Sequence, residues 1–323
     1  MNMQIKKIIQ WLVLIGLFAG AYFVFTNLQE ISDWLKLRNY QPPARIVKLA
    51  DDTTMKDPTR RVFYVNHPEL DNKVEFNEHC RQTEQSIILG CYIHNRGIYL
   101  LDVKEPRLEG VVEVTAAHEV LHAHYARLSA GERKKVDAMT SEFFKDFKDK
   151  RIRQTVENYR KKDPNIVPEE LHSILGTEVR NLSPELEKYY TRYFKDRAKI
   201  VSYSEDYEQA FVDIESQAAA IESQLQSLKT QIDSNRGRID AMNAELNAEK
   251  ARLDALLAAG RTEEYNRSVD GFNSRVASYN ALVNQTRQLI NDYNALVEKH
   301  RSLAIQQQEL YDAIDSSSLQ EKL

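Results

Sequence analysis

The sequence predicts an α+β domain, with a small antiparallel sheet and several helices, over residues 61–203. An N-terminal transmembrane helix precedes this domain, and a C-terminal antiparallel coiled-coil hairpin follows it. Three patterns lead to this prediction: an uncharged apolar run near the N-terminus, short β-forming runs followed by helical ones, and long heptad series after the last proline. The formal net charge of the 323 residues is −4, so nothing indicates a nucleic-acid partner.

The first element is the apolar run Ile8–Phe25, which contains no charged residue and has an aromatic residue near each end. Its length suits a membrane-spanning helix, and the run has no break that marks a cleavage site. We therefore expect an uncleaved signal anchor over residues 1–29. Lys6 and Lys7 precede the run, which predicts a single-pass protein of the cell membrane with a cytoplasmic N-terminus and an extracytoplasmic catalytic domain.

The next segment, residues 30–60, is polar and contains prolines, so it is predicted to be a tether. A short strand is then expected at Val62–Val65. Two further strands, Ile87–His94 and Ile98–Val103, flank Asn95-Arg96-Gly97, which is typical of a hairpin turn.

The chain has two cysteines, Cys80 and Cys91, and both lie in the part predicted to be outside the cytoplasm. An even count in an oxidising compartment indicates a disulfide between them. The alternative is that both cysteines are free thiols. They are not expected to bind zinc, because the spacing between Cys80 and Cys91 fits no zinc-binding pattern.

A helical pattern starts at Leu108 and continues to about residue 200, with breaks at 129–131, 163–168 and 183–184. Its first helix contains His118-Glu119-Val120-Leu121-His122, the H-E-x-x-H motif. Positions i and i+4 share one helix face, so both imidazoles can reach one metal ion while Glu119 lies beside it.

A strand followed by an H-E-x-x-H helix resembles the core of the zincin metallopeptidases, and residues 60–200 are most similar to their gluzincin branch. The resemblance implies a Zn²⁺ cofactor and hydrolysis of peptide or protein substrates. It also implies that His118 and His122 bind the metal and that Glu119 is the general base. Leu128 occupies the position at which the longer metzincin motif has its third histidine.

In gluzincins the third ligand is a glutamate on a later helix, and the best window is residues 168–178. Glu170, followed three residues later by Ser173, fits the gluzincin pattern and is the first choice. Glu178 is the second choice, as a ligand or as a group that orients a ligand histidine. His172 is the third.

Other polar residues of the helical region have no assigned ligand role. His124 is two residues from His122 and so faces another side of the helix, as a surface or packing residue. Tyr189, Tyr190 and Arg180 are available to stabilise an oxyanion.

Heptads without proline begin near Asp206, so residues 204–317 are predicted to form an antiparallel coiled-coil hairpin with a turn around Gly260. A disordered tail is expected at 318–323. The first series is Ile214, Ala218, Ile221, Leu225, Leu228, Ile232, Asn235, Ile239, Met242, Leu246, Glu249, Leu253 and Leu256. The second is Tyr265, Val269, Phe272, Val276, Tyr279, Val283, Thr286, Ile290, Tyr293, Val297 and His300. The hairpin is expected to act as a spacer or as a surface for a protein partner or self-association.

Two functions follow from these features. The first is a membrane-anchored, extracytoplasmic, zinc-dependent metallopeptidase that hydrolyses envelope or extracellular proteins. The order of anchor, domain and coiled coil is similar to that of bacterial membrane-anchored proteins. The alternative is a non-catalytic envelope adaptor or scaffold that works through its coiled coil and has a vestigial or structural zinc site.

Overall fold

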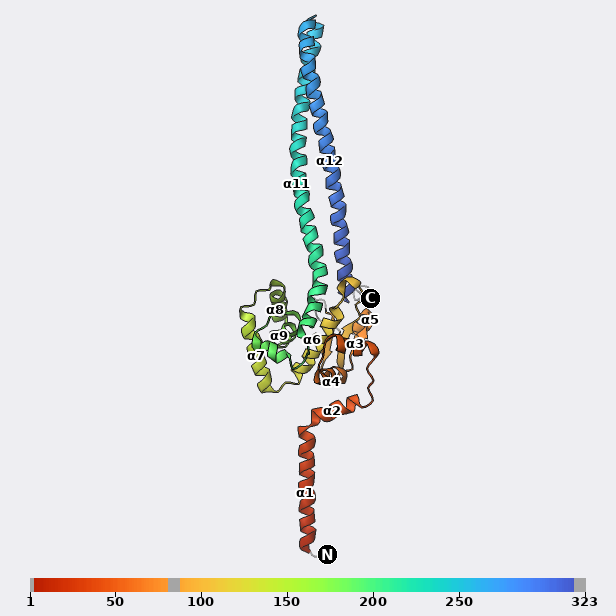
Figure 1. Ribbon diagram of the computed structural model, residues 1–323, viewed down its shortest axis with the longest axis vertical. Helices are drawn as coiled ribbons and strands as arrows, with labels where there is room; N and C mark the ends of the chain where they lie inside the picture. The colour runs from red at the N-terminus through yellow and green to blue at the C-terminus, as the bar shows by residue number, and fades with distance from the viewer. Residues whose placement is uncertain (1–2, 81–87, 317–323) are drawn as a thin grey trace. The chain divides into compact units, whose positions relative to one another are not determined.

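The computed structural model describes residues 3–80 and 88–316 (Figure 1). This part of the chain is mostly helical and contains one three-stranded sheet, which agrees with the predicted α+β class. The chain divides into two compact units, Met1–Gln209 with Asp312–Leu323, and Ala210–Tyr311. The tail predicted at 318–323 lies outside the described residues.

The apolar N-terminal run forms helix α1 (Met3–Thr26), and α2 (Leu28–Leu37) follows almost immediately. Within the part of the chain that the structure describes, no helix alone is long and apolar enough to cross a membrane. Leu14–Thr26 and Leu28–Leu37 meet these requirements only as a pair, and the two are bent by 69° relative to each other. The single membrane-spanning helix therefore stays a prediction.

The predicted tether is wrong, because residues 30–60 contribute α2, α3 (Ala44–Asp52) and the start of α4 (Asp57–Val65). On α3, the polar Arg45, Lys48 and Asp51 are exposed, whereas Ile46, Leu49 and Ala50 on the opposite face enter the core. Prolines that suggested a linker instead begin the helices, as Pro58 does in the first turn of α4.

The strand predicted at Val62–Val65 is also wrong, since these residues form the last turn of α4. Val62, Phe63 and Val65 are buried on one side of that helix. A run of four apolar, β-forming residues fits a strand or the buried side of a helix equally well, and here burial against the domain core outweighs the local β preference.

The sheet contains β1 (Glu69–Asp71), β2 (Gly90–Ile93) and β3 (Gly97–Leu101), in the order β1-β3-β2. The predicted hairpin is confirmed: β2 and β3 pair antiparallel, and Asn95 in the turn has a φ of 63°. The predicted start at Ile87 lies outside the described residues. β1 pairs parallel to β3, so the sheet is mixed and not wholly antiparallel.

Helix α6 (Val111–Ala126), which carries the H-E-x-x-H motif, contacts β2 and β3 of the sheet and packs closely on α9 (Val167–Glu178). A Cβ atom at Gly176 of α9 would lie only 2.5 Å from Leu121 Cδ1, so glycine is what permits this approach. Ser129 and Ser183 cap the helices that follow two predicted breaks, and Asp149 caps a helix after a break that was not predicted. The remaining elements of this unit are α5 (Lys73–His79), η1 (Pro106–Leu108), α7 (Ala130–Lys145), α8 (Lys150–Lys162), α9 (Val167–Glu178) and α10 (Pro184–Tyr190).

The second unit consists of the long parts of α11 (Arg197–Ala258) and α12 (Thr262–Ile314), which reverse direction at Gly260, where φ is 71°. The two helices lie side by side and antiparallel (Figure 1). The rings of Phe211 and Tyr311 are 5.2 Å apart at one end, and Glu249 pairs with Arg275 at 3.2 Å nearer the turn.

Every member of the first predicted heptad series is buried or half-buried. The second series needs a correction, because Ile290 and Val297 are exposed and their neighbours Leu289 and Leu296 are half-buried instead. The series with Ile290 and Val297 and the series with Leu289 and Leu296 both form an apolar stripe in the sequence. The register of α12 against α11 decides which pair is buried, and the sequence pattern does not specify that register.

Candidate metal centre

Three possible metal ligands converge between α6 and α9. His118 and His122 lie one turn apart on α6, and Glu170 lies in the first turn of α9. Glu170 Oε2 is 3.6 Å from His118 Nε2 and 3.7 Å from His122 Nε2. The ligand atoms of the three residues all lie within 4.8 Å of one another. The structure thus brings together the two motif histidines and the first-choice glutamate.

These distances suit a zinc ion. Two ligand atoms that are each about 2 Å from a tetrahedral metal are separated by roughly 3.4 Å. Glu170 Oε2 is buried and has no hydrogen-bond partner among the described residues, which is unfavourable for a carboxylate unless a cation satisfies it. Two imidazoles and one carboxylate are a ligand set that zinc accepts, with a fourth position left for water.

Glu169, the residue before Glu170, contacts the other side of the site. Its Oε1 atom is 3.1 Å from His122 Nδ1, so it can accept the Nδ1–H hydrogen bond and leave Nε2 free for a metal. Glu169 is not among the residues predicted from the sequence. Its position beside Glu170 is what indicates a role, because adjacent carboxylates at a helix start can contact one metal site from two directions.

The charges of the site depend on one another. Burial lowers the pKa of His122, but the carboxylates of Glu170 and Glu169 outweigh this effect and raise it to about 9. Burial raises the pKa of Glu170, while the His122 charge and the contacts with His118 and Tyr159 bring it below its ordinary value. A metal ion that binds here must therefore displace a proton from His122.

Glu119, which is on α6, is buried beside the three candidate ligands. Burial raises the pKa of its carboxyl group, and the backbone N–H of Tyr92 on β2 donates a hydrogen bond to it. Strand β2 approaches closely because of Gly90, where a Cβ atom would lie 2.9 Å from Glu119 Oε1. Gly90 is not among the residues predicted from the sequence, although a glycine within a strand pattern often marks such a close approach.

The other ligand candidates lie elsewhere. Glu178 Oε2 pairs with Arg151 at 2.9 Å, at the far end of α9. His172 is fully buried, and its Nε2 atom is 3.0 Å from the hydroxyl of Tyr189. His124 is a packing residue, as predicted. Burial lowers its pKa to about 3, and its ring lies 4.6 Å from that of Tyr193.

The residues suggested for oxyanion stabilisation have other partners. Tyr189 bonds to His172 and Tyr193, Tyr190 donates to the backbone oxygen of His172, and Arg180 pairs with Glu205. Tyr159 of α8 is the tyrosine that interacts with Glu170, and burial raises its pKa.

The predicted disulfide is present and joins Cys80, after α5, to Cys91 of β2, with the Cα atoms 6.0 Å apart. It ties α5 to the strand that passes Glu119. Near α5, Glu69, Asp71 and His79 also lie within metal-binding distance of one another. There, however, Asp71 Oδ2 already has His79 Nδ1 as a partner at 2.8 Å. The contact between these two side chains accounts for their proximity without a metal ion.

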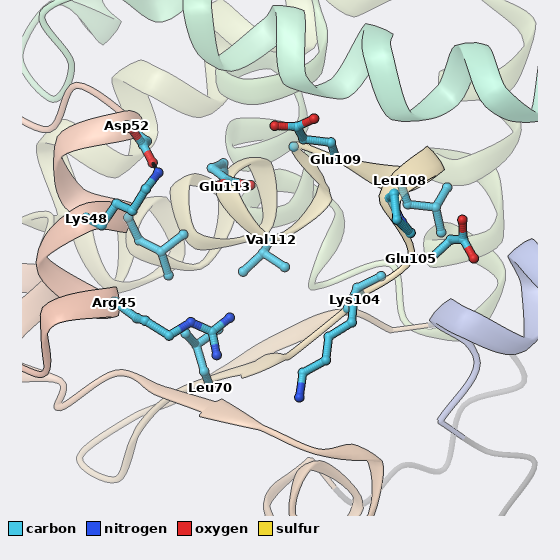
Figure 2. A pocket seen from close by; sticks show the side chains of 14 residues that line it. Arg45, Lys48, Asp52, Leu70, Lys104, Glu105, Leu108, Glu109, Val112 and Glu113 are labelled. Atoms are coloured by element: carbon cyan, nitrogen blue, oxygen red, sulfur yellow. Dashed lines mark hydrogen bonds and ion pairs between the residues drawn. The ribbon is translucent and has the colours of Figure 1, made fainter.

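A cavity of about 460 Å³ lies beside the first turn of α6, and Figure 2 shows the side chains around it. None of the three ligands lines it. Its basic residues already have acidic partners: Lys48 pairs with Asp52, and both Arg45 and Lys104 pair with Asp102. The candidate metal centre therefore does not extend into this cavity.

Comparisons with known proteins add no relative: a scan of protein-family models, a search of curated proteins and a search of solved structures each found no match to this chain.

Proposed function

We propose that the protein is a zinc-dependent metallopeptidase. The observation that supports this most directly is the convergence of His118, His122 and Glu170 around a buried, unsatisfied carboxylate oxygen, with Glu119 beside them. A structural zinc site needs four protein ligands and no neighbouring base. Three candidate ligands and a spare buried carboxylate fit a hydrolytic site better.

In the proposed mechanism, His118, His122 and Glu170 would hold a zinc ion, which would supply an acidified water molecule and a polarised substrate carbonyl group. Glu119 accepts the proton of the attacking water and delivers it to the leaving amine. Its buried position on α6, one residue after His118, suits it to take up the proton of the attacking water. Glu169 keeps His122 in the tautomer that presents Nε2 to the metal.

The proposal includes the cellular location. The apolar run of α1, the preceding Lys6 and Lys7, and the Cys80–Cys91 disulfide together support a domain that is held at the outer face of the cell membrane. The substrates are then peptides or proteins of the cell envelope or the extracellular space.

Metal analysis and hydrolysis of a broad peptide library by the purified full chain test this proposal. We expect about one zinc per chain, lost in His118→Ala and Glu170→Ala. Glu119→Gln should retain zinc but hydrolyse at least about 100-fold more slowly, because it removes the base and not a ligand. Glu178→Ala is the matched control and should retain both zinc and activity. A wild-type protein that binds no zinc contradicts the proposal.

The second candidate is a scaffold without catalysis. It is supported by the size of the helical hairpin, residues 210–311, which forms a compact unit of its own. Equal hydrolysis rates for the wild type and Glu119→Gln, with zinc bound in both, would favour this function.

A further inference from the structure

Helix α2 has its polar and apolar faces reversed relative to an ordinary surface helix. Its one fully buried residue is the charged Asp33, which is 3% exposed. Leu28, Trp34 and Leu35 are 53%, 59% and 51% exposed. At about 100° per residue, Leu28 and Leu35 lie on the face opposite Asp33, and Trp34 lies about 100° from Asp33, at the edge of that face. Some apolar phase outside the chain is needed to cover this face.

The buried face of α2 is firmly attached to the domain. Both carboxylate oxygens of Asp33 bind the guanidinium of Arg127, at 2.8 and 3.1 Å. Glu30 pairs with Arg61 of α4 at 2.8 Å, and the ring of His67 is 3.3 Å from the backbone oxygen of Lys36. A bidentate, buried ion pair restrains the orientation of α2, so the apolar face points away from the domain.

The position of α2 in the chain identifies what covers that face. Only Asn27 separates it from the apolar helix α1. Exposed leucines with a tryptophan, followed by Lys36 and Arg38, are the composition of a helix that lies in the boundary between acyl chains and headgroups. We propose that the Leu28–Trp34–Leu35 face rests on the lipid surface of the membrane that α1 enters, which rests on the proposed membrane anchoring.

This surface specifies a substrate class for the proposed peptidase. Arg127 follows His122 by five residues on the same helical segment, which is about 7.5 Å along the axis, and α2 itself is about 10 Å across. With the spacing between the two packed helices added, the metal centre is within roughly 25 Å of the lipid surface. An extended chain covers that distance in about eight residues. The substrates are therefore membrane-embedded polypeptides, cut within roughly ten residues of the point where they leave the bilayer.

The surface is tested with the full chain in phosphatidylcholine vesicles that contain anionic lipid and brominated acyl chains. Trp11→Phe leaves Trp34 as the one tryptophan. We expect bromine near the glycerol end of the acyl chain to quench Trp34 several-fold more than bromine at the chain terminus. Trp34 emission that bromine does not change at any depth overturns the lipid-facing surface and points to a protein partner.

The substrate class is tested with two probes that contain the same unstructured sequence. One probe is the free peptide. In the other, the membrane probe, this sequence extends from a peptide that spans the bilayer of the same vesicles once. Combined Leu28→Ser, Trp34→Ser and Leu35→Ser should slow cleavage of the membrane probe at least tenfold and leave the free peptide unaffected. Val74→Ser, an equally exposed apolar residue on α5, is the control and should change neither.

Equal slowing of both probes, or membrane-probe cleavage mainly beyond about 15 residues from the bilayer, overturns the substrate class. If neither probe is cut but Trp34 is quenched, the lipid surface stands and the substrate class falls together with the peptidase.

Discussion

At the scale of single residues, the site depends on which carboxylate meets which histidine nitrogen. Glu170 and Glu169 are neighbours in the chain, yet they approach His122 from opposite sides of its ring. One offers a metal ligand and the other accepts a hydrogen bond. The sequence predicts Glu170 because a ligand glutamate followed three residues later by a serine is part of the gluzincin pattern. A residue that only orients a ligand, as Glu169 does, is not part of that pattern.

Glu169→Ala should weaken zinc binding about 10- to 100-fold, because His122 then loses the acceptor that orients its ring. Glu169→Gln should restore part of the affinity, as its amide oxygen still accepts the Nδ1–H bond. Chelator competition at several pH values measures both effects. Glu178→Ala, on the same helix but paired with Arg151, is the control, and an equal loss in that variant would contradict the assignment.

At the scale of elements, α8, α9 and the start of α11 meet at one shared guanidinium group, that of Arg151. Arg151 of α8 pairs with Glu178 of α9 at 2.9 Å and with Glu208 of α11 at 2.8 Å. Two carboxylates thus share one positive charge. Burial, together with the charge of Glu178, raises the pKa of Glu208 from 4.5 to about 7 in spite of Arg151.

This pKa shift predicts how stability depends on pH. Between pH 4.5 and 7 the unfolded chain has released the Glu208 proton while the folded protein still holds it, so the free energy of unfolding falls as pH rises. Glu208→Gln should remove this contribution. The variant should match the wild type below pH 4.5 and exceed it by on the order of 1–3 kcal/mol above pH 7.

Urea unfolding across pH 4–8 measures the difference. The control is Glu205→Gln, one turn earlier on α11, where the carboxylate is half exposed and Arg180 lowers its pKa. That variant should differ from the wild type by less than about 1 kcal/mol at every pH, because exposed ion pairs contribute little. A Glu208→Gln variant that is less stable above pH 7 would show that the Arg151 ion pair outweighs burial.

At the scale of the whole molecule, one question is whether the long helices pair within one chain. Leu228 lies beside Leu296 around a shared gap in the hairpin, and both are half-buried. Cysteines at these two positions should therefore form a disulfide within one chain. Leu228→Cys with Ile290→Cys is the control and should crosslink poorly, because Ile290 is exposed. Gel mobility under non-reducing conditions separates this result from crosslinks between chains.

The sequence alone determined the features that depend on local chemistry and short spacing. These are the H-E-x-x-H helix, the β2–β3 hairpin turn at Asn95, the paired cysteines, the helix breaks at 129–131, 163–168 and 183–184, and the first heptad series. Each depends on neighbours within a few residues, so propensity, turn geometry and periodicity contain the information.

Only the tertiary structure decided the features that depend on distant partners. It made helices of the expected tether, because the apolar sides of α3 and α4 pack against the core and the buried Asp33 of α2 pairs with Arg127. It paired β1 with β3 in parallel, brought Glu170 rather than Glu178 to the histidines, and exposed the apolar face of α2. The physical reason is the same in each case: burial and charge pairing join residues that are far apart in the chain, and their free energies exceed local preferences.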